Sequence, residues 1–155
     1  MESSNTKKIL FDTQTRVAPL GLISMNGTQE LGSKINDYLV KWGKDQGMEN
    51  DSYLIETDCP RFSSGDGKGL IKSTVRGNDL FILCDVGNYS CTYNYFGMEN
   101  AMSPDDHYQD LKRIIQAASG KAHRINVIMP SLYGGRQHRR SYRESLDCEV
   151  GGKRS

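Results

Sequence analysis

Apolar residues recur along the chain with two spacings, and together these spacings predict alternating strands and helices. Short apolar runs favour buried strands, and they occur at Gly21–Met25, Tyr53–Ile55, Leu70–Val75, Leu80–Cys84 and Ile125–Met129. Helical spacing places Leu31, Ile35, Tyr38, Leu39 and Trp42 on one face, with Thr28 as the N-cap and Gly47 as the stop. A second face carries Tyr108, Leu111, Ile114, Ile115 and Ala118, between a Ser103-Pro104 helix start and Gly120. The order β-α-β…β-α-β predicts an α/β fold with a parallel-rich sheet flanked by helices.

The remaining segments show no clean periodicity. Residues 1–18 are predicted to form an N-terminal extension, residues 19–149 a single domain and residues 150–155 a tail. Residues 86–102 are rich in tyrosine and methionine and are predicted to form a long, partly packed loop. A further helix is expected to begin near Arg143.

Composition and charge narrow the class of protein. The 155 residues are 36% hydrophobic and 25% charged, and their formal net charge of +1 makes a nucleic-acid partner unlikely despite a basic stretch from Arg136 onward. No 18-residue apolar run predicts a membrane span, and the N-terminus lacks the apolar core of a secretory signal. We therefore expect a cytoplasmic protein without a membrane partner.

The four cysteines do not have the spacing of a metal site. Cys59, Cys84, Cys91 and Cys148 form no C-x-x-C pair, and no histidine lies near them at ligand spacing. We expect reduced thiols and no bound structural metal.

The segment after the last predicted strand carries the clearest chemistry. Pro130 and the pair Gly134-Gly135 lead into Arg136, Arg139 and Arg140. Arginines and backbone N–H groups at the carboxyl end of a strand are the groups with which α/β proteins bind phosphate-bearing ligands. A solvated basic loop is the alternative.

This segment resembles the ribose-phosphate pyrophosphokinases (PRPP synthetases), which carry a strand, a proline and an Arg-Gln pair at this spacing. Four other stretches resemble the same family in the same order, over roughly residues 20–148: Leu22–Gly27 with the helix that follows, Arg61–Ser63, Val75–Leu83 and Arg143–Cys148. The resemblance implies a phosphoribosyltransferase-like fold, of which this chain is an incomplete N-terminal domain.

The resemblance also implies roles for particular residues. Arg136 and Gln137 would contact ATP, and Phe62 would pack against adenine in a neighbouring subunit. Asp66 would take the place of an acidic residue of the family after a two-residue insertion. Arg76, Arg140 and Arg143 would bind a regulatory phosphate or ADP. The alternatives are a hairpin-core role for Phe62 and an ion pair between Arg76 and Asp79. Catalytic residues cannot be assigned.

The implied reaction is diphosphoryl transfer from Mg²⁺-ATP to ribose 5-phosphate, giving PRPP and AMP. The chain lacks the family's Asp-Leu-His-like segment and the Thr-Gly-Gly loop that holds ribose 5-phosphate, so we expect it to be inactive alone. We expect a homo-oligomer or a complex with a full-length paralogue. The alternative is a non-catalytic nucleotide- or phosphate-binding partner of full-length synthetases.

Overall fold

The computed structural model describes residues 18–136, 138–139 and 142–143. The elements are β1 (Leu20–Ser24), α2 (Gln29–Asp45), β2 (Thr57–Asp58), β3 (Leu70–Ile71), β4 (Asp79–Leu83), β5 (Thr92–Tyr95), β6 (Met98–Ala101), α3 (Pro104–Ala118) and β7 (Arg124–Ile128). The expected extension, tail and last helix lie outside the described residues, apart from Ala18 and Arg143. No helix in the described part of the chain is long and apolar enough to cross a membrane.

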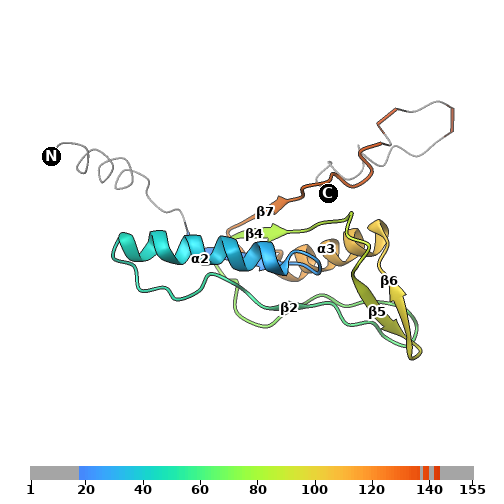
Figure 1. The fold of residues 1–155 in the computed structure, drawn as a ribbon, viewed down its shortest axis with the longest axis horizontal. Coiled ribbons are helices and arrows are strands. Elements are labelled where there is room, and N and C mark those ends of the chain that lie inside the picture. The colour runs from blue at the N-terminus through green and yellow to red at the C-terminus, as the bar shows by residue number, and fades with distance from the viewer. Residues whose placement is uncertain (1–17, 137, 140–141, 144–155) are drawn as a thin grey trace.

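A parallel three-stranded sheet in the order β1-β4-β7 forms the centre of the fold (Figure 1), and this confirms the predicted parallel-rich sheet. Ile23, Leu80 and Ile82 are fully buried on one face of the sheet, where they join Leu111 and Ile114 of α3 in a single core. On the other face Leu22 and Leu83 are buried beneath α2, together with Tyr53. Helices therefore cover both faces, as is usual for a parallel sheet.

The three central strands begin one residue before their predicted starts, but two other predicted strands are much shorter. The run 53–55 makes only a single parallel bridge, between Leu54 and Leu22. Of the run 70–75, only Leu70–Ile71 is a strand, paired antiparallel with β2. Residues 86–102 were wrongly predicted to be a loop, because β5 and β6 form an antiparallel hairpin there. Phe96 and Gly97 make its two-residue turn with φ of 51° and 73°, a combination that the left-handed turns of hairpins require.

The predicted buried face of α2 is only partly right: Ile35 and Leu39 pack against the core around Leu22, Tyr53 and Leu83. Leu31, Tyr38 and Trp42 are 45%, 62% and 59% exposed, whereas Gly32, Asn36 and Gly43 are buried. A Cβ on Gly32 would lie 1.7 Å from Ser24 Oγ, so glycine allows the helix to approach β1 closely. Asn36 Oδ1 accepts a hydrogen bond from the Tyr53 backbone N–H at 2.8 Å. Small and hydrogen-bonded residues thus face the sheet together with Ile35 and Leu39, and take the place of Leu31, Tyr38 and Trp42.

The start of α3 follows the sequence prediction. Ser103 caps the helix, and its hydroxyl accepts a hydrogen bond from the Asp106 N–H at 3.2 Å. The Asp106 carboxylate accepts the Ser103 N–H at 2.9 Å, which completes a capping box. Leu111, Ile114 and Ala118 are buried as the helical spacing predicts.

Candidate functional site

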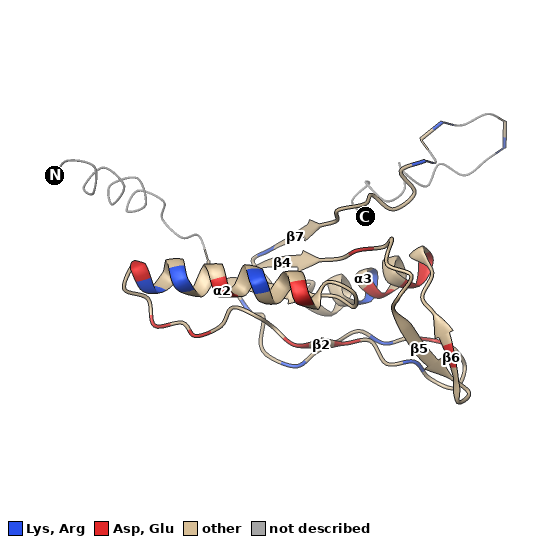
Figure 2. Cartoon of the chain, viewed as in Figure 1, with Lys and Arg blue, Asp and Glu red and all other residues tan. Residues whose placement is uncertain are grey.

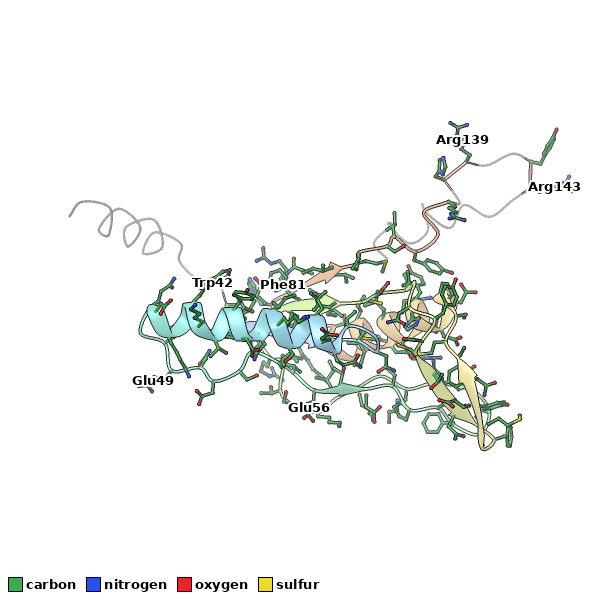
Figure 3. All side chains as sticks on the ribbon, viewed as in Figure 1. Trp42, Glu49, Glu56, Phe81, Arg139 and Arg143 are labelled. Carbon is green, nitrogen blue, oxygen red and sulfur yellow. The ribbon has the colours of Figure 1, made fainter. Side chains whose placement is uncertain are left out.

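The loop that follows β7 carries the cations expected to contact phosphate. It leaves the carboxyl edge of the sheet, and its basic residues lie in its second part, from Arg136 onward (Figure 2). Arg136 is exposed, and Gly134, with φ of 64°, allows the turn that precedes it. Tyr133 connects this loop to α3 through its ring and hydroxyl. Gln137 and Arg140 lie outside the described residues, while Arg139 and Arg143 extend away from the body of the domain (Figure 3).

Phe62 lies at the start of a tight turn. Arg61 and Gly67 form an antiparallel bridge, and the Phe62 N–H donates to the Asp66 carbonyl at 2.8 Å. The Phe62 side chain is 52% exposed, so the alternative of a hairpin-core residue is wrong. Asp66 is exposed as well, and its carboxylate accepts a hydrogen bond from the Ser64 hydroxyl at 2.8 Å. Both side chains are therefore accessible to a ligand or a partner.

A buried ion pair fixes the base of this turn to α3. Arg61 donates two hydrogen bonds to Asp110, at 2.6 and 3.0 Å, and Arg113 donates to the same carboxylate at 2.8 Å. The Arg61 and Asp110 side chains are 5% and 3% exposed. Burial alone would lower the pKa of Arg61, but the hydrogen bonds and charge of Asp110 outweigh it and raise the pKa. The Tyr93 ring of β5 lies 5.0 Å from the guanidinium. No sequence pattern predicts these long-range contacts.

Arg76 lies at the opposite end of the sheet from Arg136. It precedes β4, whereas Arg136 follows β7, and these two strands run parallel. The Asp79 carboxylate accepts hydrogen bonds from Arg124 Nε at 2.9 Å and from the Asn126 side-chain amide at 3.0 Å. The alternative ion pair between Arg76 and Asp79 is therefore wrong. Arg76 and Arg136 cannot bind the same phosphate group within one chain, because a five-residue strand separates its two ends by about 17 Å.

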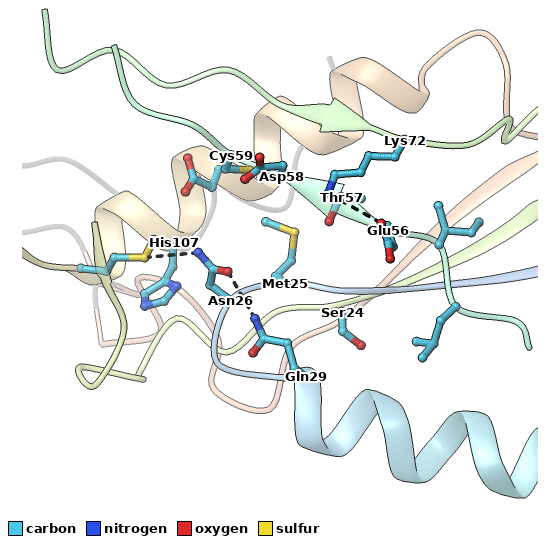
Figure 4. A pocket seen from close by; sticks show the side chains of 14 residues that line it. Ser24, Met25, Asn26, Gln29, Glu56, Thr57, Asp58, Cys59, Lys72 and His107 are labelled. Atoms are coloured by element: carbon cyan, nitrogen blue, oxygen red, sulfur yellow. Dashed lines mark hydrogen bonds and ion pairs between the residues drawn. The ribbon is translucent and has the colours of Figure 1, made fainter. Parts of the chain in front are cut away.

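A cleft of about 300 Å³ opens beyond the carboxyl end of β1 (Figure 4). Asn26 and Gln29 line it from the turn into α2, Glu56 and Lys72 form an ion pair at 3.6 Å, and the segment 54–59 forms one wall. It contains none of the residues predicted from the sequence to bind a ligand.

The chemistry of this cleft does not favour catalysis. Burial raises the pKa of the Cys59 thiol to about 12, so it remains protonated and a poor nucleophile. His107 is buried, and its Nε2 lies 2.8 Å from the Asn88 carbonyl. Within the described residues no group of three or more His, Cys, Asp or Glu side chains could hold a metal ion.

The fold and the loop define the class of protein as an α/β domain with helices on both faces of a parallel sheet and a basic loop at its carboxyl edge. A family model, described as the N-terminal domain of ribose phosphate pyrophosphokinase, matches residues 20–151. The chain belongs to this family. Comparison with curated proteins gave no match.

Among solved structures, phosphoribosylpyrophosphate synthetase from Mycobacterium smegmatis has a similar fold, with a TM-score of 0.56 and 18% sequence identity. The similarity covers 86% of this chain and 40% of the mycobacterial chain, so this chain spans less than half the length of that relative. At this identity the likeness establishes the shared α/β fold.

Proposed function

We propose that this chain supplies part of the ATP side of a ribose-phosphate diphosphokinase and turns over no substrate alone. The observation that carries the proposal is the exposed Arg136, on the loop that follows β7 within the region matched by the family model. An arginine there can donate two parallel hydrogen bonds to phosphate oxygens. Gln137, the next residue, is proposed as a second contact with the nucleotide.

Phe62 and Asp66 are proposed to serve a nucleotide bound by another subunit. Their turn is attached to α3 through Asp110, whereas the Arg136 loop is attached through Tyr108 and Asp105. Successive residues of an α-helix are rotated by about 100°, so Asp110 lies on a different flank of α3 from Asp105 and Tyr108. An exposed aromatic side chain such as Phe62 can stack on adenine with little demand for polar geometry. A second copy or a full-length paralogue is the proposed partner.

Magnesium is proposed to arrive as part of Mg²⁺-ATP. Mg²⁺ in nucleotide enzymes is commonly held by one or two carboxylates together with the substrate phosphates. This fits a described chain without a clustered set of metal-binding side chains. Arg76 and the exposed Arg143 remain proposed contacts for a regulatory phosphate or ADP, together with Arg140.

Isothermal titration of the purified chain with Mg²⁺-ATP tests the proposal. We expect saturable binding, and Arg136→Ala should weaken it by roughly 10- to 100-fold, the usual loss for hydrogen bonds to a charged group. Lys41→Ala removes an exposed cation from α2 and is the matched control, with no change expected.

Three outcomes separate the alternatives. AMP formation that depends on ribose 5-phosphate would overturn the expectation of inactivity, and absent ATP binding would overturn the nucleotide site. Equal affinities for ATP and ADP, with no turnover when a full-length synthetase lacking its own ATP site is added, would favour a non-catalytic binding partner.

A further inference from the structure

Tyr133 attaches the Arg136 loop to α3 by two contacts. Its ring stacks on Tyr108, with centroids 4.0 Å apart and ring planes only 4° from parallel. Its hydroxyl donates a hydrogen bond to Asp105 Oδ1 at 2.8 Å. Asp105 and Tyr108 are three residues apart on α3, so their side chains project on the same side of the helix.

Tyr133 is also the main attachment of this loop to the domain. Its side chain is half-buried and packs against the core, whereas Pro130, Ser131, Leu132 and Arg136 are exposed. The Tyr133 N–H lies 3.3 Å from the Met129 sulfur, and the Gly135 N–H donates to the Leu132 carbonyl at 3.1 Å. The path from Met129 to Arg136 is therefore set largely by how Tyr133 is held.

We propose that Tyr108 and Asp105 are positioning residues for Arg136, acting through Tyr133. This inference rests on the proposed function, because it assumes that Arg136 contacts the phosphates of ATP. A free loop would lose backbone conformational freedom on binding a nucleotide, and each residue fixed in advance reduces that cost. The stack on Tyr108 supplies the attachment, and the Asp105 hydrogen bond fixes the rotation of the Tyr133 ring.

A purely structural role would give a different result from a positioning role. If the stack only stabilises the fold, its loss should weaken ATP binding equally whether or not Arg136 is present. If the stack acts through Arg136, its loss should have a smaller effect once Arg136 is alanine. A double-mutant cycle measures this difference.

The experiment measures Mg²⁺-ATP affinity for the full chain, Tyr108→Ala, Arg136→Ala and the double variant, each checked for folding by circular dichroism. We expect Tyr108→Ala alone to weaken binding by about two- to tenfold, the range for an aromatic pair, and to have a smaller effect in the Arg136→Ala background. Tyr108→Phe keeps the ring and should retain the affinity of the unmodified chain. Tyr38→Ala removes an exposed aromatic ring from α2 and is the control.

Amide hydrogen exchange provides a readout that needs no nucleotide. Tyr108→Ala should speed exchange across residues 131–136 and leave β4 unchanged. Tyr133→Phe keeps the stack and loses the hydrogen bond to Asp105, so its exchange rate across residues 131–136 should lie between those of the unmodified chain and Tyr108→Ala. This variant also covers the case in which Tyr108→Ala does not fold.

The failures are distinguishable. If the unmodified chain binds no Mg²⁺-ATP, the proposed function and this inference both fail. If it binds but the effect of Tyr108→Ala is the same with and without Arg136, or if exchange at 131–136 does not change, only the positioning role is overturned.

Discussion

Arg61 and Asp110 form a buried ion pair that attaches an exposed turn to a helix. Both side chains are almost fully buried, and the carboxylate accepts hydrogen bonds from two arginines. Removing charges from water is costly, and the pair is tolerated because its geometry satisfies most of the polar atoms. The loss of Asp110 would leave Arg61 buried with only the more distant Asp106 carboxylate, at 3.9 Å, to compensate its charge.

We therefore expect Asp110→Ala to lower the free energy of unfolding by about 3–5 kcal/mol, since the buried Arg61 would lose both of its hydrogen-bonded oxygen partners. Urea denaturation followed by tryptophan fluorescence measures this change. Lys72→Ala removes one partner of an exposed ion pair and should cost less than about 1 kcal/mol. Equal costs for the two variants would contradict the assigned role of Asp110.

At the scale of elements, helix and strand positions could be predicted from the sequence better than the faces they bury. Ser103 and Pro104 identified the start of α3, because capping chemistry is local. The buried face of α2 depends instead on Gly32 fitting against Ser24 and on Asn36 bonding the backbone of Tyr53, contacts between separate elements that helical spacing does not specify. Likewise, the exposed Arg136 could be proposed from its motif, because that motif is local. Its attachment to α3 through Tyr108 could not be predicted, because that contact joins two separate elements.

The hairpin shows a second reason for failure. Tyr93 and Tyr95 alternate with Thr92 and Asn94, which is a weak strand signal. The turn uses Phe96 before Gly97, whereas the strongest hairpin signals place Asn or Asp before the glycine. Positive φ at Phe96 is set by the paired strands and could not be predicted from the residue type.

The start of α3 should make stability depend on pH. Burial alone would raise the pKa of Asp106, but hydrogen bonds from the Ser103 backbone and hydroxyl and the charge of Arg61 outweigh it and lower the pKa below 3.8. A lowered folded-state pKa stabilises the protein above the unfolded value of 3.8, and this contribution is lost as pH falls through the folded value. We expect the free energy of unfolding to fall below about pH 4, and Asp106→Asn to flatten that fall.

Urea titrations at a series of pH values measure this dependence. Asp37→Asn, at an exposed aspartate of α2, is the matched control and should keep the slope of the unmodified chain. An identical acid slope for Asp106→Asn would show that the capping box contributes nothing to the pH dependence.

At the scale of the whole molecule, the domain has an incompletely covered side. Tyr38 and Trp42 of α2 are exposed, with their ring centroids 6.1 Å apart, and Phe81 lies on β4 in the sheet that α2 covers (Figure 3). Ile128 at the end of β7 is 45% exposed. Within the described residues β7 pairs only with β4, so its outer edge offers backbone groups without a strand partner.

We expect the chain to self-associate in a concentration-dependent manner through this side, since exposed apolar side chains next to an unpaired strand edge favour association. Trp42→Lys and Ile128→Lys should each shift sedimentation velocity profiles toward the monomer. Met98→Lys makes the same change at an exposed position of the β5–β6 hairpin and should have no effect. A monomer at all concentrations would contradict this expectation.

The parallel pairing of β1 with β4 has a consequence for synthesis on the ribosome. Leu20 pairs with Asp79, so β1 must wait until roughly 60 more residues have been made, which takes about 3–12 s at ordinary translation rates. The β5–β6 hairpin, in contrast, joins neighbouring residues and can close within microseconds of its emergence. For those seconds Leu22 and Ile23 have no strand beside them on the β4 side, and this apolar stretch is where a nascent-chain chaperone would bind.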